Sequence, residues 1–189
     1  MDAWNLPVSA VIGGREYFFN ADFRDVLDIL RRLDDPEQPE FLRWQVALAL
    51  FYESYETMPA GDRGEAAEYL ARFINCGREE EETGAAAPKL LDWQQDAAVI
   101  VADVNRTAGC EVRALPFLHW WSFMAFFNGI GEGQLATLVS IRDKLRRGKK
   151  LEKWEQEYYR EHKSRVDLKR RYTAEELAEQ RRLETLLQG

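Results

Sequence analysis

The chain has 189 residues, of which 46% are hydrophobic and 31% charged, and its formal net charge at pH 7 is −7. This composition is typical of a globular protein and excludes an intrinsically disordered chain. Two cysteines, Cys76 and Cys110, and two histidines cannot build a disulfide framework or a cysteine-rich metal site, so we expect no metal and no cofactor. The chain does not start with the basic, apolar and small-residue pattern of a secretory signal, and we do not expect secretion.

A β-hairpin is predicted near the start of the chain. Apolar residues alternate over residues 8–12, and Gly13-Gly14 can supply the positive φ angles of a two-residue turn. This turn places Tyr17 opposite Ala10. Because a lone hairpin is only marginally stable in water, one of its faces must rest on another element.

Three amphipathic helices are predicted after the hairpin. Their apolar stripes begin at Phe23, after Pro39 and after Asp62, and Asp62 with Glu65 resembles a capping arrangement. Residues 77–88 contain four consecutive glutamates and are predicted to form an acidic loop. We assign no catalytic role to this loop, because adjacent solvated carboxylates cannot separate their pKa values.

The middle of the chain is its most apolar part. Residues 114–131 contain no formally charged side chain, and Pro116 and Asn128-Gly129 predict a helix over 116–128. Such a helix is about 20 Å long at about 1.5 Å per residue, whereas a hydrocarbon layer is about 30 Å thick. We therefore expect no membrane span and place this helix at the buried centre of a bundle.

Further helices are predicted in the charged C-terminal part. One ends near Gly148, a strongly charged one begins with Leu151, Trp154 and Tyr158, and a capping box at Thr173 begins the last. The predicted fold is mainly α, a helical bundle with an N-terminal two-stranded β-hairpin and a charged C-terminal helical arm.

The charge is unevenly distributed along the chain. Residues 142–189 carry 15 basic and 10 acidic residues, whereas residues 1–141 carry 11 basic and 23 acidic residues. This asymmetry predicts two parts, a body over 1–148 and a charged arm over 149–189. The arm is either a solvated charged extension or a functional segment, and the composition leaves both readings open.

No arrangement of residues points to catalysis. His119 and Ser122 share a helix face, but no oxyanion hole can be identified, and a core histidine with one hydrogen-bond partner explains the pattern. The alternating glycines Gly129, Gly131 and Gly133 follow a helix rather than a strand, so they do not form a phosphate-binding loop. We expect that the protein is not an enzyme and has no catalytic, cofactor-binding or metal-binding residues.

The segment 142–171 could in principle contact nucleic acid. It has 13 basic and 6 acidic residues, with Trp154, Tyr158 and Tyr159 interleaved, and basic residues could contact phosphates while aromatic rings stack on bases. The acidic residues alternate with the basic ones, however, as they do on a solvated helix face. We keep nucleic acid as the third candidate partner.

The stretch between Trp93 and Arg142 carries a distinctive set of short motifs. They are Gln95-Asp96, Gly109-Cys-Glu-Val112, Leu118-His119-Trp120-Trp121-Ser-Phe123, Asn128-Gly129-Ile130 and Ile141-Arg142. Upstream, Gly14-Arg-Glu-Tyr17 and Asp22-Phe23-Arg24 also look like the opening of the same family, and the tyrosine-rich charged helix downstream is similar too. With these features the chain resembles the bacteriophage gene-product-fifteen family over most of residues 5–160.

The resemblance implies a phage or prophage protein of the tail gene cluster. Members of this family are regarded as tail assembly chaperones, so we expect a non-catalytic tail assembly or tail-morphogenesis protein in the cytoplasm of the bacterial host. Its partners would be phage tail proteins, above all the tape-measure protein, and self-association into a homo-oligomer is left open. The alternative is a structural component of the virion tail.

The resemblance also implies a structural signature, formed by Asp96, His119, Trp120, Trp121 and Phe123. We expect the three aromatic residues to be largely buried. A buried carboxylate needs a partner, and for Asp96 we expect either His119 or a helix-terminal backbone amide.

The arm supplies the candidate partner-binding residues. Its apolar residues are sparse, so we expect little packing on its own domain and a contact with another molecule through Leu151, Trp154 and Tyr158. A solvated extension is the alternative.

Overall fold

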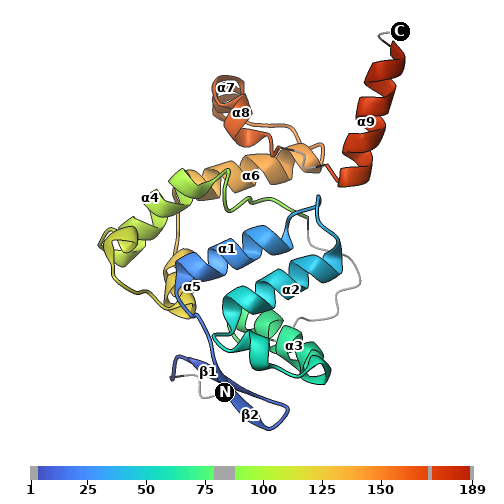
Figure 1. Ribbon diagram of the computed structural model, residues 1–189. Coiled ribbons are helices and arrows are strands. Elements are labelled where there is room, and N and C mark those ends of the chain that lie inside the picture. The colour runs from blue at the N-terminus through green and yellow to red at the C-terminus, as the bar shows by residue number, and fades with distance from the viewer. Residues whose placement is uncertain (1–3, 79–87, 170–171, 188–189) are drawn as a thin grey trace. The chain divides into compact units, whose positions relative to one another are not determined.

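The computed structural model describes residues 4–78, 88–169 and 172–187 (Figure 1). The chain divides into two compact units, unit 1 with residues 1–78 and 170–189, and unit 2 with residues 79–169. The fold is mainly α with an N-terminal hairpin, which confirms the predicted class. The acidic loop predicted over 77–88 lies, for residues 79–87, outside the described residues.

Unit 1 begins with the hairpin and continues with helices. Its elements before residue 79 are β1 (Ser9–Ile12), β2 (Arg15–Phe18), α1 (Phe23–Leu33), α2 (Glu40–Phe51), the 3₁₀ turns η1 (Tyr55–Thr57) and η2 (Ala60–Asp62), and α3 (Arg63–Ile74). The strands are antiparallel with Ala10 opposite Tyr17, as predicted. Gly13 and Gly14 adopt φ angles of 56° and 76°, which residues with a Cβ atom rarely adopt.

The inner face of the hairpin rests on an aromatic cluster contributed by α2 and α3. The ring of Phe19, just after β2, stacks on Phe51 at 4.5 Å and meets Phe73 edge-on at 4.9 Å. Tyr52 is buried beside them and donates its hydroxyl to the Ala66 carbonyl at 3.0 Å. α1 and α2 pack side by side as an antiparallel pair (Figure 1).

Unit 2 contains the apolar middle of the sequence and the start of the predicted arm. Its elements are α4 (Ala97–Ala108), η3 (Val112–Ala114), α5 (Trp120–Asn128), α6 (Gln134–Arg146), α7 (Lys153–Glu161) and α8 (Lys163–Val166). α9 (Ala174–Leu187) follows in the chain and is grouped with unit 1. Its predicted capping box is present, because Thr173 Oγ1 accepts the Glu176 amide at 3.1 Å and the Glu176 carboxylate accepts the Thr173 amide at 2.9 Å.

The helix predicted over 116–128 is shorter than expected. α5 begins at Trp120 rather than at Pro116, because His119 Nδ1 accepts the Trp121 amide at 3.0 Å and caps the helix there. The helix ends at Asn128, as predicted. Within the part of the chain that the structure describes, no helix has the length and apolarity to cross a membrane.

The expectation that the arm packs little on its own domain is wrong for its first half. Leu151 and Val166 form an apolar cluster with Leu138 and Ile141 of α6, and α7 and α8 lie beside α6 (Figure 1). The change in charge near residue 148 is therefore not a boundary in packing. A charged segment needs few apolar residues to dock when the facing helix presents an uncovered apolar stripe.

Candidate functional site

Two members of the signature form the aromatic core of unit 2. Trp120 and Phe123 are each 1% exposed, and their rings stack with centroids 5.6 Å apart. Trp93, just before α4, lies edge-on against Trp120 at 6.0 Å. Trp121 is only half-buried, so the expected burial is confirmed in full for Trp120 and Phe123 alone.

His119 has a structural role in this geometry. Its ring is buried, and Nδ1 accepts the backbone N–H of Trp121 as the cap of α5. A ring nitrogen that accepts a hydrogen bond carries no proton. The imidazole therefore satisfies one of the amides that the first turn of a helix leaves without a partner.

A buried ion pair joins α6 to the residue before α4. The Asp96 carboxylate binds Arg142 through both oxygens, at 2.6 Å to Nη1 and 2.8 Å to Nη2, and the two side chains are 0% and 5% exposed. The rest of the guanidinium donates to carbonyls: Nε to Val166 at 2.7 Å, Nη1 to Leu90 at 3.0 Å and Nη2 to Arg165 at 2.8 Å. All five N–H groups of Arg142 thus have acceptors.

The partner of Asp96 differs from the one we expected. We expected His119 or a helix-terminal amide, whereas the carboxylate binds Arg142 and also accepts the Asp92 amide at 2.9 Å. Arg142 was missed as a functional residue, although Ile141-Arg142 is one of the motifs. No helical or strand periodicity connects two residues so far apart in the chain.

Gln95 holds the same stretch of the arm as Arg142. Its Nε2 donates to the Asp167 carbonyl at 2.9 Å and to the Arg165 carbonyl at 3.2 Å, while its Oε1 accepts the Lys169 amide at 3.0 Å. Gln95, Asp96 and Arg142 are called the arm clamp below. The clamp side chains bind backbone groups at the end of the α7–α8 segment. This attachment therefore does not depend on which side chains stand at residues 165–169.

A second carboxylate organises the start of α6. Asp103 is buried on α4, and its Oδ2 accepts the Leu135 amide at 2.9 Å. A Cβ atom at Gly133 would lie 2.6 Å from Arg106 Nη2 and 2.7 Å from the same Asp103 oxygen, so a larger residue here would displace these two side chains. This contact explains one of the alternating glycines between α5 and α6.

The start of α7 is anchored on α6. The Glu155 carboxylate binds Lys144 Nζ at 2.6 Å and accepts the Glu152 amide at 2.7 Å in a capping box. The hydrogen bond from Lys144 lowers the pKa of the Glu155 carboxyl below its ordinary value. α7 therefore has one side fixed to unit 2 by an ion pair and by the apolar cluster.

The three candidate partner-binding residues do not share one surface. Leu151 is 8% exposed and belongs to the apolar cluster, so its assignment as a surface contact is wrong. Tyr158 is half-buried against the same cluster, with its ring 4.6 Å from that of His162. Trp154 is 56% exposed and is the one of the three that projects into solvent.

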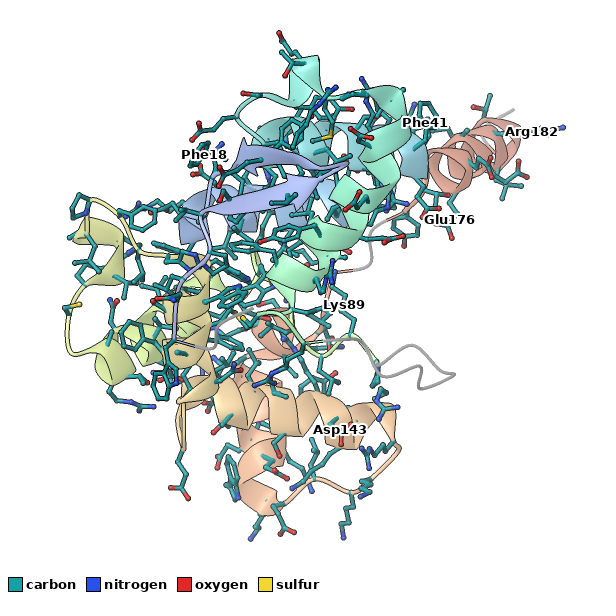
Figure 2. All side chains as sticks on the ribbon, turned by 90° about the horizontal axis from the view of Figure 1, so that it is seen from below. Phe18, Phe41, Lys89, Asp143, Glu176 and Arg182 are labelled. Carbon is teal, nitrogen blue, oxygen red and sulfur yellow. The ribbon has the colours of Figure 1, made fainter. Side chains whose placement is uncertain are left out.

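Exposed lysines flank this tryptophan in the sequence. Lys149 and Lys150 lie in the loop before α7 and Lys153 in its first turn, and no carboxylate among the described residues forms an ion pair with them. We call Trp154 with these three lysines the Trp154 patch. Asp143, labelled in Figure 2, binds Arg146 in the last turn of α6 and Arg147, the residue that follows the helix.

A protein-family model described as Bacteriophage Gp15 protein matches residues 4–168. The chain belongs to this family. This confirms the resemblance seen in the sequence motifs. No curated protein and no solved structure matches the chain.

Three of the five motifs of this Gp15 family member have a clear structural task. Gln95-Asp96 and Ile141-Arg142 supply the arm clamp, whereas His119 to Phe123 supply the cap and the core of α5. The family match ends at residue 168, beside the last hydrogen bond of the clamp. Among residues 4–78, 88–169 and 172–187, no group of His, Cys, Asp and Glu side chains is placed to hold a metal ion.

Proposed function

We propose that this Gp15 protein is a non-catalytic tail assembly chaperone, which binds the tape-measure protein of its phage in the host cytoplasm. The observation that carries the proposal is the exposure of Trp154, 56%, on a helix whose other side is anchored. Tryptophan is mostly buried in proteins and is enriched among the residues that dominate binding energy at interfaces.

The anchoring of α7 supports a role in binding. The arm clamp holds the end of the α7–α8 segment, and the Glu155–Lys144 pair holds its beginning. A side chain on a helix fixed at both ends loses little conformational freedom when a partner covers it. Preorganisation of this kind raises affinity, because less entropy is lost on association.

The chemistry of the partner explains why such a protein would be needed. A tape-measure protein is long, helical and rich in apolar stripes, which associate with one another until the tail tube encloses them. A chaperone that covers part of a stripe keeps the protein available for assembly, and its own net charge of −7 opposes aggregation of the complex.

Co-expression with the tape-measure protein of the same phage tests the proposal. We expect the soluble fraction of the tape-measure protein to rise several-fold in the presence of this chain and to fall again with Trp154→Ala. Phe41→Ala, which removes another exposed aromatic residue (Figure 2), is the matched control and should keep full activity. An unchanged soluble fraction with the wild-type chain would refute the proposal.

Mass spectrometry of purified virions separates the chaperone from a structural tail component. A chaperone is released during assembly and is absent from mature particles. Recovery of the chain at a fixed number of copies per virion would favour the structural role.

A further inference from the structure

We propose that the Trp154 patch recognises an acidic segment of its protein partner, in which carboxylates flank an apolar side chain that packs on Trp154. The inference rests on the proposed function, because the partner it describes is the tape-measure protein. The patch comprises Lys149, Lys150, Lys153 and Trp154, and it begins two residues after Arg147, the C-cap of α6.

The positive charge of the patch is not neutralised within the described part of unit 2. Residues 144–154 include six basic residues and one acidic residue. That acidic residue, Glu152, uses its carboxylate to cap the first turn of α7. The neighbouring carboxylates have other partners, since Asp143 binds Arg146 and Arg147 and Glu155 binds Lys144.

The surroundings of the patch favour an acidic peptide over nucleic acid. Binding of a single strand requires several aromatic side chains on which successive bases stack. Here Tyr158 packs on the apolar cluster, and Tyr159 donates its hydroxyl to Asp167 at 3.0 Å, so between Lys153 and Val166 Trp154 is the one exposed aromatic ring. Farther along α7, Glu157 and Glu161 are exposed and would repel a continuous phosphate backbone.

The short extent of the patch defines its ligand. The lysines lie within five consecutive residues, Lys149 to Lys153, so they suit two or three carboxylates in a compact stretch rather than an extended polyanion. The flexible lysine side chains can adapt to carboxylates at several positions. The indole ring provides apolar contact area, and its N–H group is a hydrogen-bond donor.

The test uses overlapping 20-residue peptides that span the tape-measure protein, probed with the full chain. We expect the binding peptides to carry a net negative charge and at least one large apolar residue, and their binding to weaken with salt. K150E/K153E should weaken binding of the best peptide at least tenfold, and W154A should do the same. R181E/R182E on α9 is the matched control, since it reverses the same number of exposed charges (Arg182 in Figure 2).

Three outcomes would overturn the inference. In the first, the binding peptides are neutral or basic. In the second, K150E/K153E weakens binding no more than R181E/R182E does. In the third, a 30-nucleotide single strand of DNA binds the chain more tightly than any peptide and is lost with K150E/K153E. If the full-length tape-measure protein does not bind the chain at all, the proposed function itself fails. If it binds but one of the first two outcomes is observed, only the assignment of the patch fails.

Discussion

Substitution of Arg142 by alanine tests the central structural feature of unit 2. The change removes the counter-charge of Asp96, a carboxylate that is completely buried. It also removes the donors that Leu90, Arg165 and Val166 use at their carbonyl oxygens. The α7–α8 segment then keeps its apolar cluster and the hydrogen bonds to Gln95 but loses its main polar attachment.

The expected cost follows from the burial of the ion pair. Removal of one partner of a buried pair destabilises a protein by about 3–5 kcal/mol, because the remaining charge is left without compensation. The three carbonyls do not add their full cost, since the segment can detach and return them to water. We therefore expect the free energy of unfolding of unit 2 to fall by about 3–5 kcal/mol, with local opening of α7 and α8.

Urea denaturation followed by tryptophan fluorescence measures this loss. Four of the six tryptophans, Trp93, Trp120, Trp121 and Trp154, lie in unit 2 and report on its unfolding. Hydrogen exchange over residues 151–168 reports the local opening. The matched control is Arg146→Ala, which breaks a more exposed pair with Asp143 on the same helix and should change stability by about 0.5 kcal/mol or less.

A double substitution checks the cause. Asp96→Ala with Arg142→Ala should cost clearly less than the two single changes added together, because no buried charge is left alone in the double variant. The reasoning is wrong if Arg142→Ala lowers the unfolding free energy by less than about 1 kcal/mol, or if exchange over 151–168 stays at its wild-type rate.

Three further predictions concern the stability of the core, the packing of the arm and the pH dependence of the Glu155–Lys144 ion pair. Trp120→Ala should lower the unfolding free energy by about 3–5 kcal/mol, whereas Trp154→Ala should cost less than about 1 kcal/mol, as thermal and urea unfolding will show. A chain shortened after Lys169 should keep the stability of unit 2, whereas one shortened after Gly148 should unfold at lower urea because Leu138 and Ile141 become exposed; equal midpoints would contradict this. Because the pKa of Glu155 is lowered in the folded protein, its ion pair contributes stability above the pKa of the unfolded chain, and this contribution is lost as the pH falls through the folded pKa. Glu155→Gln should therefore flatten the acid limb of a plot of stability against pH, and exposed Glu157→Gln should leave it unchanged.

Local features of the sequence were enough to predict several elements. Gly13-Gly14 determines the hairpin turn, because two consecutive residues need positive φ angles there. Thr173 and Glu176 determine the start of α9, because both groups of a capping box lie within one helical turn. The burial of Trp120 and Phe123 followed from a stretch with no charged face to present to water.

The tertiary structure decided which residues of the arm remain exposed. Leu151 is covered because it meets Leu138 and Ile141 of α6, and the sequence contains no local sign of that encounter. Trp154 stays exposed on the same helix.

The arm clamp also depends on contacts between distant parts of the chain. Asp96 and Arg142 lie 46 residues apart, and Gln95 binds Lys169 across 74 residues. The sequence motifs include Gln95, Asp96 and Arg142, but they do not show which of these residues bind one another. A charged side chain pairs with whichever group the fold brings within hydrogen-bonding distance. Periodicity describes a residue's own helix or strand, and a buried ion pair is determined by the packing of several elements at once.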